Sequence, residues 1–207
     1  MKSKNKKAYI IGIGSHAITV KDLAESENYK IKGFIFIPQN KKLNIPKKIS
    51  SIPILQLKNL KKTDTVFLAI GDIKFRNKVY LDLRNKYRFP KLISKNSIIS
   101  KNSIILNASI VFPGVIINSN SKINENCIIN TGAIIEHDVS VGASSNVSPG
   151  SIICGSVKIG NQCLVGAGAI IRDKIKVGTK SIVGVGSNVI KNVSPNTIVI
   201  GNPSKKI

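Results

Sequence analysis

The sequence contains no tryptophan, only 5% aromatic residues and just two histidines among its 207 residues. So few aromatic side chains leave little surface on which nucleobases or sugar rings could stack. The three cysteines, Cys127, Cys154 and Cys163, have no CxxC spacing, and their odd number does not suit a disulfide scaffold. Together with two histidines they match no structural zinc motif, so we expect no metal.

Long hydrophobic runs are also lacking. No stretch of about 18 apolar residues occurs, so no membrane-spanning helix is predicted. The apolar segment Ala8–Ile11 is interrupted at Gly12 and is too short for a signal sequence. We therefore expect a cytoplasmic protein that does not insert into a membrane.

Acidic residues are scarce, because 10 aspartates and glutamates stand against 32 lysines and arginines, for a formal net charge of +22. Such a charge suits anionic partners. The lysines are scattered, and their densest cluster, Lys2–Lys7, is terminal, which argues against nucleic acid. An anionic small ligand such as a nucleotide or coenzyme A is the better match.

Isoleucine or valine occupies every sixth position from Ile93 onward without interruption. A period of six suits neither a helix nor a simple alternating strand. It predicts one short strand and one turn per six residues, so that three such units close a triangular coil. Stacked coils would pair their strands in parallel and bury the repeated residue. The 17 positions are Ile93, Ile99, Ile105, Val111, Ile117, Ile123, Ile129, Ile135, Val141, Val147, Ile153, Ile159, Val165, Ile171, Val177, Val183 and Val189.

Two other positions of the six-residue unit are informative. The residue four places after each repeated one is mostly small, which accounts for Cys127 and Cys163 as interior residues. The residue five places after it should face outward and forms columns along the prism. One column is apolar and contains Ile98, Ile116, Ile134, Ile152 and Ile170, and another is polar and contains Lys122, Ser140, Lys158 and Lys176.

The outward isoleucine column predicts an oligomer. A solvent-exposed apolar stripe is a liability, and prisms that pack side by side around a threefold axis would cover it. A homotrimer is therefore expected, although a monomeric prism with an accidental apolar face stays open. The 93–207 segment resembles the left-handed parallel β-helix of hexapeptide-repeat proteins, and the resemblance supplies the left-handed turn.

The first 92 residues have a different pattern. Strands are expected at 7–14, 30–37 and 65–70, and helices at 16–27 and 75–87, with a polar loop over 41–51. Strands that alternate with helices are typical of a small Rossmann-like α/β domain. The expected fold is therefore α/β plus all-β, with domains at 1–92 and 93–207.

Gly12-x-Gly14-x-x-Ala17 follows the first strand and opens the first helix, which is a weak form of the dinucleotide-binding pattern. The acidic residue expected after the second strand is replaced by Ile37-Pro38, so an NAD-dependent dehydrogenase is disfavoured. Two alternatives remain: a tight turn without a ligand, and a pocket for a nucleotide or nucleotide sugar.

His137 is the single histidine of the repeat region, and it lies at a predicted corner between Glu136 and Asp138. A corner side chain points out of the prism, so burial in the core does not explain it. It is either an ordinary surface histidine or a general base that an adjacent carboxylate orients.

Four segments carry a family resemblance. They are Ile129–Gly150 (INTGAIIEHDVSVGASSNVSPG), Val199–Ile207 (VIGNPSKKI), IGIGSH near the N-terminus and FLAIGDIKFRNK. They resemble the sugar acetyltransferases of the sialic acid O-acetyltransferase (NeuD/PglD) family. That resemblance implies a homotrimeric, acetyl-CoA-dependent enzyme of bacterial glycan biosynthesis. Its residues 1–92 would bind a nucleotide sugar, and its β-helix would hold coenzyme A between subunits.

The resemblance also implies roles for individual residues. His137 would be the general base and Asp138 its acidic support. The turn at Gly14, Ser15 and His16 would receive the phosphates of the nucleotide sugar. The remaining implied contacts are Gly71 and Asn130 to the substrate, and Asn146, Gly155, Ala167 and Val185 to acetyl-CoA.

Two departures from the family pattern affect the expected substrate. Asn146 stands where the family often has a histidine at the thioester, and Ile37-Pro38 replaces an acidic pair that grips uridine. We expect N-acetylation of a nucleotide-linked amino sugar. O-acetylation of sialic acid or a related nonulosonic acid is the alternative, and a non-catalytic β-helix scaffold is the alternative of another class. A three-histidine metal enzyme is disfavoured, because the repeat region has one histidine.

Overall fold

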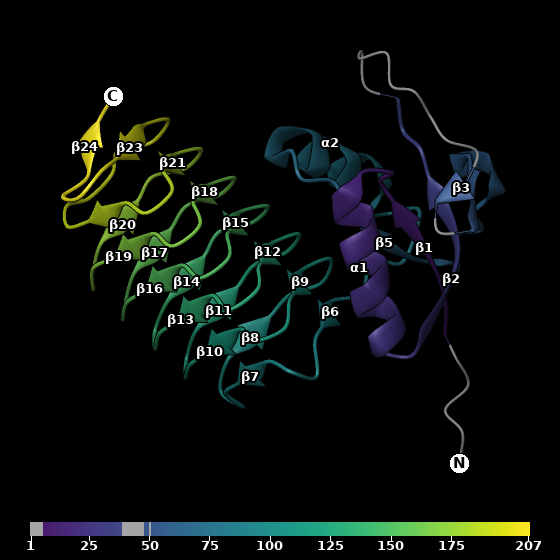
Figure 1. The fold of residues 1–207 in the computed structure, drawn as a ribbon, viewed down its shortest axis with the longest axis horizontal. Helices are drawn as coiled ribbons and strands as arrows, with labels where there is room; N and C mark the ends of the chain where they lie inside the picture. The colour runs from purple at the N-terminus through teal and green to yellow at the C-terminus, as the bar shows by residue number, and fades with distance from the viewer. Residues whose placement is uncertain (1–5, 39–47, 50) are drawn as a thin grey trace. The chain divides into compact units, whose positions relative to one another are not determined.

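A computed structural model of the chain describes residues 6–38, 48–49 and 51–207 (Figure 1). The chain divides into two compact units, residues 1–92 and 93–207, and each is described by itself. Within the described residues, no helix is both long and apolar enough to span a bilayer.

The first unit contains a five-stranded sheet with the strand order β3-β4-β2-β1-β5. The strands β1, β2, β4 and β5 run parallel, and β3 pairs antiparallel with β4. This is the small parallel α/β domain that the sequence predicts. The elements are β1 (Lys6–Ile11), α1 (Ser15–Ser26), β2 (Tyr29–Ile35), β3 (Lys48–Ile49), β4 (Ile52–Leu55), the 3₁₀ helix η1 (Leu57–Asn59), β5 (Thr65–Leu68) and α2 (Ile73–Leu83).

The element boundaries differ from the predicted ones for local reasons. The second helix begins at Ile73 rather than at 75, because the Asp72 carboxylate accepts a hydrogen bond of 2.7 Å from the Phe75 N–H and caps it. Residues 41–47 and 50 of the predicted loop lie outside the described residues. At Lys48–Ile49 the loop prediction is wrong, because these residues pair with β4.

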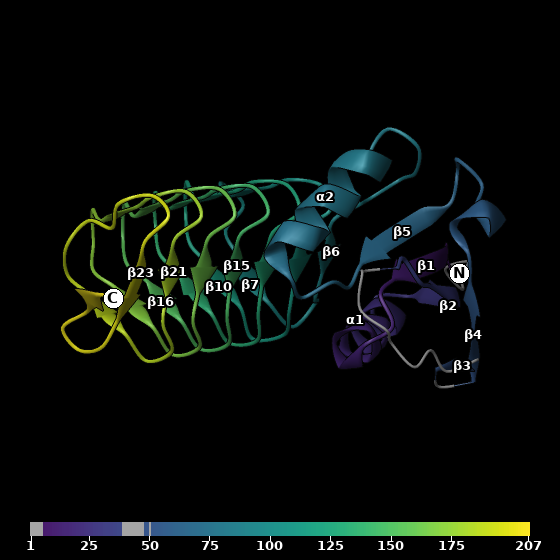
Figure 2. The same cartoon turned by 90° about the horizontal axis from the view of Figure 1, so that it is seen from above.

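The second unit is a solenoid in which β6 to β22 are seventeen strands of two residues each (Figure 2). From β7 to β19, each strand pairs in parallel with the strand three places later in the chain, which lies in the next coil. Residues 18 positions apart therefore lie side by side, as Ile135 and Ile153 do. We call the outer surfaces of its three sheets the mixed face, the isoleucine face and the lysine face. The mixed face contains β6 (Leu92–Ile93), β9 (Ile110–Val111), β12 (Ile128–Ile129), β15 (Asn146–Val147), β18 (Leu164–Val165), β21 (Ile182–Val183), β23 (Ile198–Ile200) and β24 (Lys205–Lys206). The isoleucine face contains β7 (Ile98–Ile99), β10 (Ile116–Ile117), β13 (Ile134–Ile135), β16 (Ile152–Ile153), β19 (Ile170–Ile171) and β22 (Asn188–Val189). The lysine face contains β8 (Ile104–Ile105), β11 (Lys122–Ile123), β14 (Ser140–Val141), β17 (Lys158–Ile159) and β20 (Lys176–Val177).

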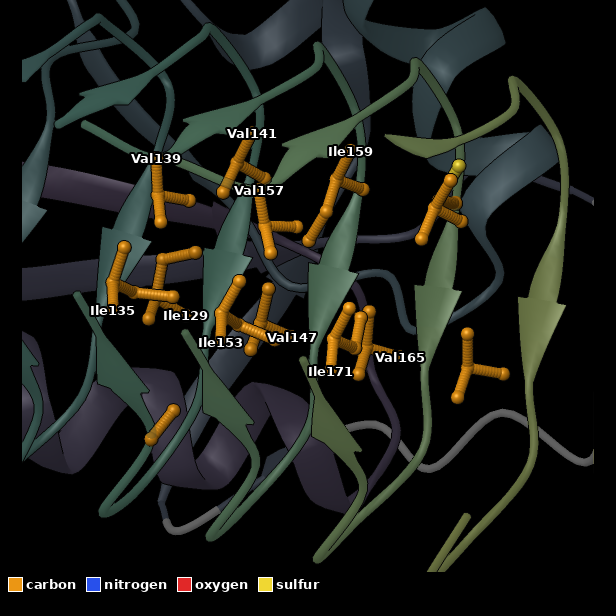
Figure 3. Close-up of a cluster of buried hydrophobic side chains, with 14 of the residues drawn as sticks. Ile129, Ile135, Val139, Val141, Val147, Ile153, Val157, Ile159, Val165 and Ile171 are labelled. Atoms are coloured by element: carbon orange, nitrogen blue, oxygen red, sulfur yellow. The ribbon is translucent and has the colours of Figure 1, made fainter. Parts of the chain in front are cut away.

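The repeated Ile and Val side chains form the core of the solenoid, as predicted. Fifteen of the seventeen are buried in one cluster, and Ile93 and Ile99 pack against it partly buried at the first coil. Figure 3 shows Ile135, Ile153 and Ile171 stacked along one side of this interior. The small residues between strands are buried too, apart from the partly buried Ser97 and Ser103, and Cys127 and Cys163 are among the buried ones. The six-residue period therefore determined which side chains lie inside.

The corners of the coils require special backbone conformations. Asp138 has a φ of +61°, and the equivalent residues one coil before and after it, Asn120 and Ser156, have φ values of +61° and +60°. At Gly142 an added Cβ would lie 2.4 Å from the carbonyl carbon of Gly160, so this corner tolerates no side chain. The corners can therefore stack as closely as the strands do.

Candidate active site

His137 lies at the corner that joins β13 on the isoleucine face to β14 on the lysine face. Backbone hydrogen bonds fix this corner to both neighbouring coils. The Asp138 N–H donates to the carbonyl of Ser119 (3.0 Å), and the His137 carbonyl accepts from the N–H of Ser156 (2.9 Å). The His137 side chain is 61% exposed, so the corner presents it to solvent on a rigid backbone.

The Asp138 carboxylate orients the imidazole. Its Oδ2 lies 2.8 Å from Nδ1 of His137, and its Oδ1 accepts from the side-chain amide of Asn120 at 3.3 Å. These hydrogen bonds, that of His137 first, lower the pKa of the Asp138 carboxyl. An ionised carboxylate on Nδ1 favours the tautomer that carries its proton there, and leaves the Nε2 lone pair free to accept a proton. The pair thus has the geometry of a general base and its support.

Gly155 makes room for this ring. It occupies the same corner position as His137 one coil later, and an added Cβ would lie 2.7 Å from both Cε1 and Nε2 of the imidazole. The sequence resemblance suggests Gly155 as a contact to acetyl-CoA. The structure gives it an additional role, because Nε2 occupies the space that any side chain at 155 would fill.

Replacing Gly155 by alanine should therefore lower kcat by about 10²-fold, the order expected when a reacting group is displaced by roughly 1 Å. The exposed ring can swing away, so the melting temperature should stay within a few degrees of the wild-type value. Ser156→Ala is the matched control. Ser156 has a φ of 60°, and alanine can adopt this conformation at a corner, since Ala108 has a φ of 61°. Steady-state kinetics and thermal unfolding of both variants test this. Wild-type kcat in the Gly155→Ala variant would contradict the assigned role.

The other implied site residues of the solenoid lie elsewhere on its surface. Asn130 is at the corner between the mixed face and the isoleucine face, where its Oδ1 accepts from the Thr131 N–H (2.8 Å). Ala167 and Val185 lie at the same corner two and three coils later, and Val185 is 79% exposed. Asn146 begins β15 on the mixed face. Within one chain, the implied site residues therefore occupy opposite edges of the isoleucine face. One edge carries His137 and Gly155, and the other carries Asn130, Ala167 and Val185.

A pocket of about 370 Å³ in the first unit brings together the implied residues of that unit. Gly14, Ser15, His16 and Gly71 all line it, because the C-terminal ends of β1 and β5 are neighbours in the sheet. An added Cβ at Gly14 or Gly71 would meet no atom within 4 Å, so both glycines leave open space. The complete lining is Ile11, Gly12, Ile13, Gly14, Ser15, His16, Phe36, Ile37, Ala69, Ile70, Gly71, Asp72 and Phe75.

The N-terminus of α1 opens onto this pocket without a side-chain cap, since its N-cap residue is Gly14. Uncapped N–H groups at a helix N-terminus are a ready site for an anion. Burial, and then the nearby guanidinium of Arg76, lower the pKa of His16, so its imidazole is neutral at pH 7. Arg76 is itself buried and donates to the Ile70 carbonyl at 3.0 Å.

Sequence reasoning missed part of this pocket. Phe36 and Phe75 line it as aromatic surfaces, and Asp72 closes it beside Gly71. Phe36 directly follows β2, and Asp72 and Phe75 lie at the start of α2, the helix that follows β5. These positions were the available signal, because ligands of parallel sheets bind beyond the C-terminal ends of strands. Ile37 lines the pocket, whereas the exposed Pro38 does not. In the described part of the chain, no group of three or more His, Cys, Asp or Glu side chains is arranged to hold a metal.

Comparison with known proteins identifies the first unit. The family model of the PglD N-terminal domain matches residues 7–83. Over these residues the first unit is similar to a PglD N-terminal domain, and we refer to it below as the PglD domain. Its glycine turn and its α1 and α2 all lie within the matched range.

Solved structures match the PglD domain and the solenoid together. A histidine-to-alanine variant of GDP-perosamine N-acetyltransferase from Caulobacter crescentus, in complex with CoA and GDP-perosamine, is 25% identical with a TM-score of 0.88, over 99% of this chain and 98% of that one. The acetyltransferase domain of PglB from Neisseria gonorrhoeae with acetyl coenzyme A is 25% identical with a TM-score of 0.88, over 98% and 100%. WeeI from Acinetobacter baumannii is 23% identical with a TM-score of 0.80, over 98% and 100%.

These matches confirm the resemblance to sugar acetyltransferases of the NeuD/PglD type and the left-handed β-helix fold. No sequence among the curated proteins matched the chain significantly.

Proposed function

We propose that the protein transfers an acetyl group from acetyl-CoA to an amino group of a nucleotide-linked amino sugar. The observation that carries this proposal is the His137–Asp138 pair, held at 2.8 Å on a solvent-facing corner. It lies in a chain whose two units together match acetyltransferases that were solved with CoA and with GDP-perosamine. The proposed reaction belongs to bacterial glycan biosynthesis and takes place in the cytoplasm, where acetyl-CoA is available.

The proposed chemistry needs one base and no metal. The acceptor amine attacks the carbonyl carbon of the thioester, and Nε2 of His137 takes the proton that the amine loses. The carbon–sulfur bond then breaks, and the departing sulfur takes that proton from the His137 imidazolium, so the coenzyme leaves as a thiol and the base is neutral again. Asp138 stabilises the imidazolium that forms in between, because its carboxylate accepts the Nδ1–H bond. The products are the N-acetylated sugar and free coenzyme A.

The position of the site residues supports a homotrimer. His137 and Gly155 lie on one edge of the isoleucine face, and Asn130, Ala167 and Val185 lie on the other. A cyclic arrangement joins two different patches of neighbouring copies, so it can bring the His137 edge of one chain against the Asn130 edge of the next. Three equivalent grooves result, and each holds acetyl-CoA between two chains. The Asn146 amide then serves as a hydrogen-bond donor near the thioester.

The PglD domain is the proposed site of the nucleotide. The glycine turn at Gly14, Ser15 and His16 receives the diphosphate at the N-terminus of α1. A neutral His16 accepts or donates one hydrogen bond there, and the nucleobase packs on the apolar lining near Phe36. In this division of labour residues 1–92 bind the activated sugar and residues 93–207 carry out the transfer.

One observation favours a second acceptor class. Ile37 lines the pocket where the family pattern has an acidic residue that grips uridine. A free sialic acid or related nonulosonic acid, O-acetylated on a hydroxyl, needs no such grip. The general base has the same role for a hydroxyl as for an amine.

Mass spectrometry of reaction products tests the proposal. The purified protein is incubated with acetyl-CoA and a panel of UDP-, GDP- and dTDP-linked amino sugars and free nonulosonic acids. We expect a gain of one acetyl group on a nucleotide-linked amino sugar, stable to mild alkaline hydroxylamine as an amide is. A hydroxylamine-sensitive product on a nonulosonic acid would support the second class instead. Failure of acetyl-CoA to raise the melting temperature would refute both and favour a scaffold.

A further inference from the structure

The edge that carries His137 also carries three cations on later coils. His137, Gly155, Asp173 and Lys191 occupy the same corner position of four successive coils, and Arg172 and Lys174 flank Asp173. The side chains of Arg172, Lys174 and Lys191 are exposed, and none forms an ion pair with another described residue. We call these three residues the cationic ladder.

The distance from His137 to the ladder follows from the parallel register. Neighbouring strands of a sheet lie about 4.8 Å apart, so Arg172 and Lys174 are roughly 10 Å and Lys191 roughly 14 Å further along the edge. The pantetheine arm of coenzyme A is about as long as four extended residues, which corresponds to roughly 14 Å. A coenzyme whose thioester meets His137 therefore places its diphosphate beside these cations.

On this basis we propose that Arg172, Lys174 and Lys191 bind the phosphates of coenzyme A. The inference rests on the proposed function, since it takes His137 as the position of the thioester. Arg172 can contact two phosphate oxygens at once, and the two lysines act as point charges. Asp173 reduces the charge of the ladder but leaves it net positive.

The opposite direction along the same edge does not fit the coenzyme. The edge extends only two coils before His137, to the corner between β7 and β8, which is roughly 10 Å away. That corner holds one cation, Lys101, with Ser100 and Asn102 in the places of Arg172 and Lys174. With a single cation it is too weakly charged for the diphosphate, and the edge has no further corner at roughly 14 Å in that direction.

The neighbouring lysine face adds to the positive potential around the ladder. Lys158 and Lys176 are directly paired on adjacent strands, and neither forms an ion pair with a described residue. Like charges at paired positions are unfavourable unless a counter-charge lies nearby. A bound coenzyme with several phosphate charges supplies that counter-charge from outside the chain.

A triple variant, Arg172→Gln with Lys174→Gln and Lys191→Gln, tests the ladder. Glutamine suits position 174, where φ is +60°, since Gln162 has a φ of 55° at another corner. The matched control is Lys95→Gln with Lys101→Gln and Lys122→Gln, which removes the same charge from earlier coils. Titration calorimetry measures the Kd for coenzyme A, and ligand-observed NMR measures binding of pantetheine, which lacks all the phosphates.

We expect the ladder variant to bind coenzyme A about tenfold more weakly, because three partly screened charge contacts are lost. Pantetheine binding should not change, and the control should differ from wild type by less than twofold. An unchanged Kd for coenzyme A, or an equal loss for pantetheine, would overturn the ladder while the proposed function stands. No binding of coenzyme A by the wild-type protein would overturn both.

Discussion

Replacing His137 by alanine should lower kcat by about 10²–10⁴-fold, the usual contribution of a general base. The chain should keep its fold, because the side chain is exposed and does not belong to the core cluster. Acetyl-CoA binding should also persist, since the proposed contacts to its phosphates lie on other coils. Steady-state kinetics with the acceptor identified by mass spectrometry, together with calorimetry for acetyl-CoA, measure the two effects separately.

Asp138→Asn is the graded control for this prediction. It should cost less than the loss of His137, because the base remains while the carboxylate that stabilises the imidazolium is removed. The asparagine side chain is also compatible with the φ of +61° at this corner, as Asn120 shows. If the His137→Ala variant turned over at near the wild-type rate, the mechanism would be wrong. His16 would then be the remaining histidine to test, although it lines the pocket of the PglD domain.

A pair of aspartates on the isoleucine face should convert a trimer to monomers and strongly lower turnover. Ile134 and Ile152 are neighbours on β13 and β16, and both are partly exposed in the single chain. In the proposed assembly they are covered by another copy, and burying an unpaired carboxylate costs several kcal/mol per group. Light scattering should show that the double variant, Ile134→Asp with Ile152→Asp, is monomeric at micromolar concentration. Activity should fall by at least about 10²-fold, because the two edges of the groove no longer meet.

The matched control places the same charges on the lysine face. Ile104→Asp with Ser140→Asp changes two outward strand positions and makes the same change in net charge. That variant should remain trimeric and active. A wild-type protein that is monomeric at micromolar concentration would contradict the assembly, and so would an aspartate pair at 134 and 152 that leaves the trimer intact. The isoleucine face would then be an exposed apolar surface with another explanation.

The sequence by itself determined the solenoid, because a six-residue period specifies the environment of each position. Fifteen of the seventeen repeated Ile and Val residues form one core cluster and the other two pack against it, and no position needed knowledge of distant residues to be placed. The first unit was predictable in element order but not in boundaries. Its helix start at Ile73 depends on the Asp72 cap, and β3 exists only because β4 is there to pair with it.

The candidate site depended on contacts that no local pattern encodes. The sequence singled out His137 beside Asp138, but the hydrogen bond from Asn120 and the space above Gly155 join residues 18 positions apart. Those contacts follow from the stacking of coils. In the first unit, Gly14 and Gly71 share a pocket because β1 and β5 are adjacent in the sheet, although the two glycines are 57 positions apart in the sequence. Periodicity determines which way a side chain points, whereas only the closed tertiary structure decides which distant side chains it meets.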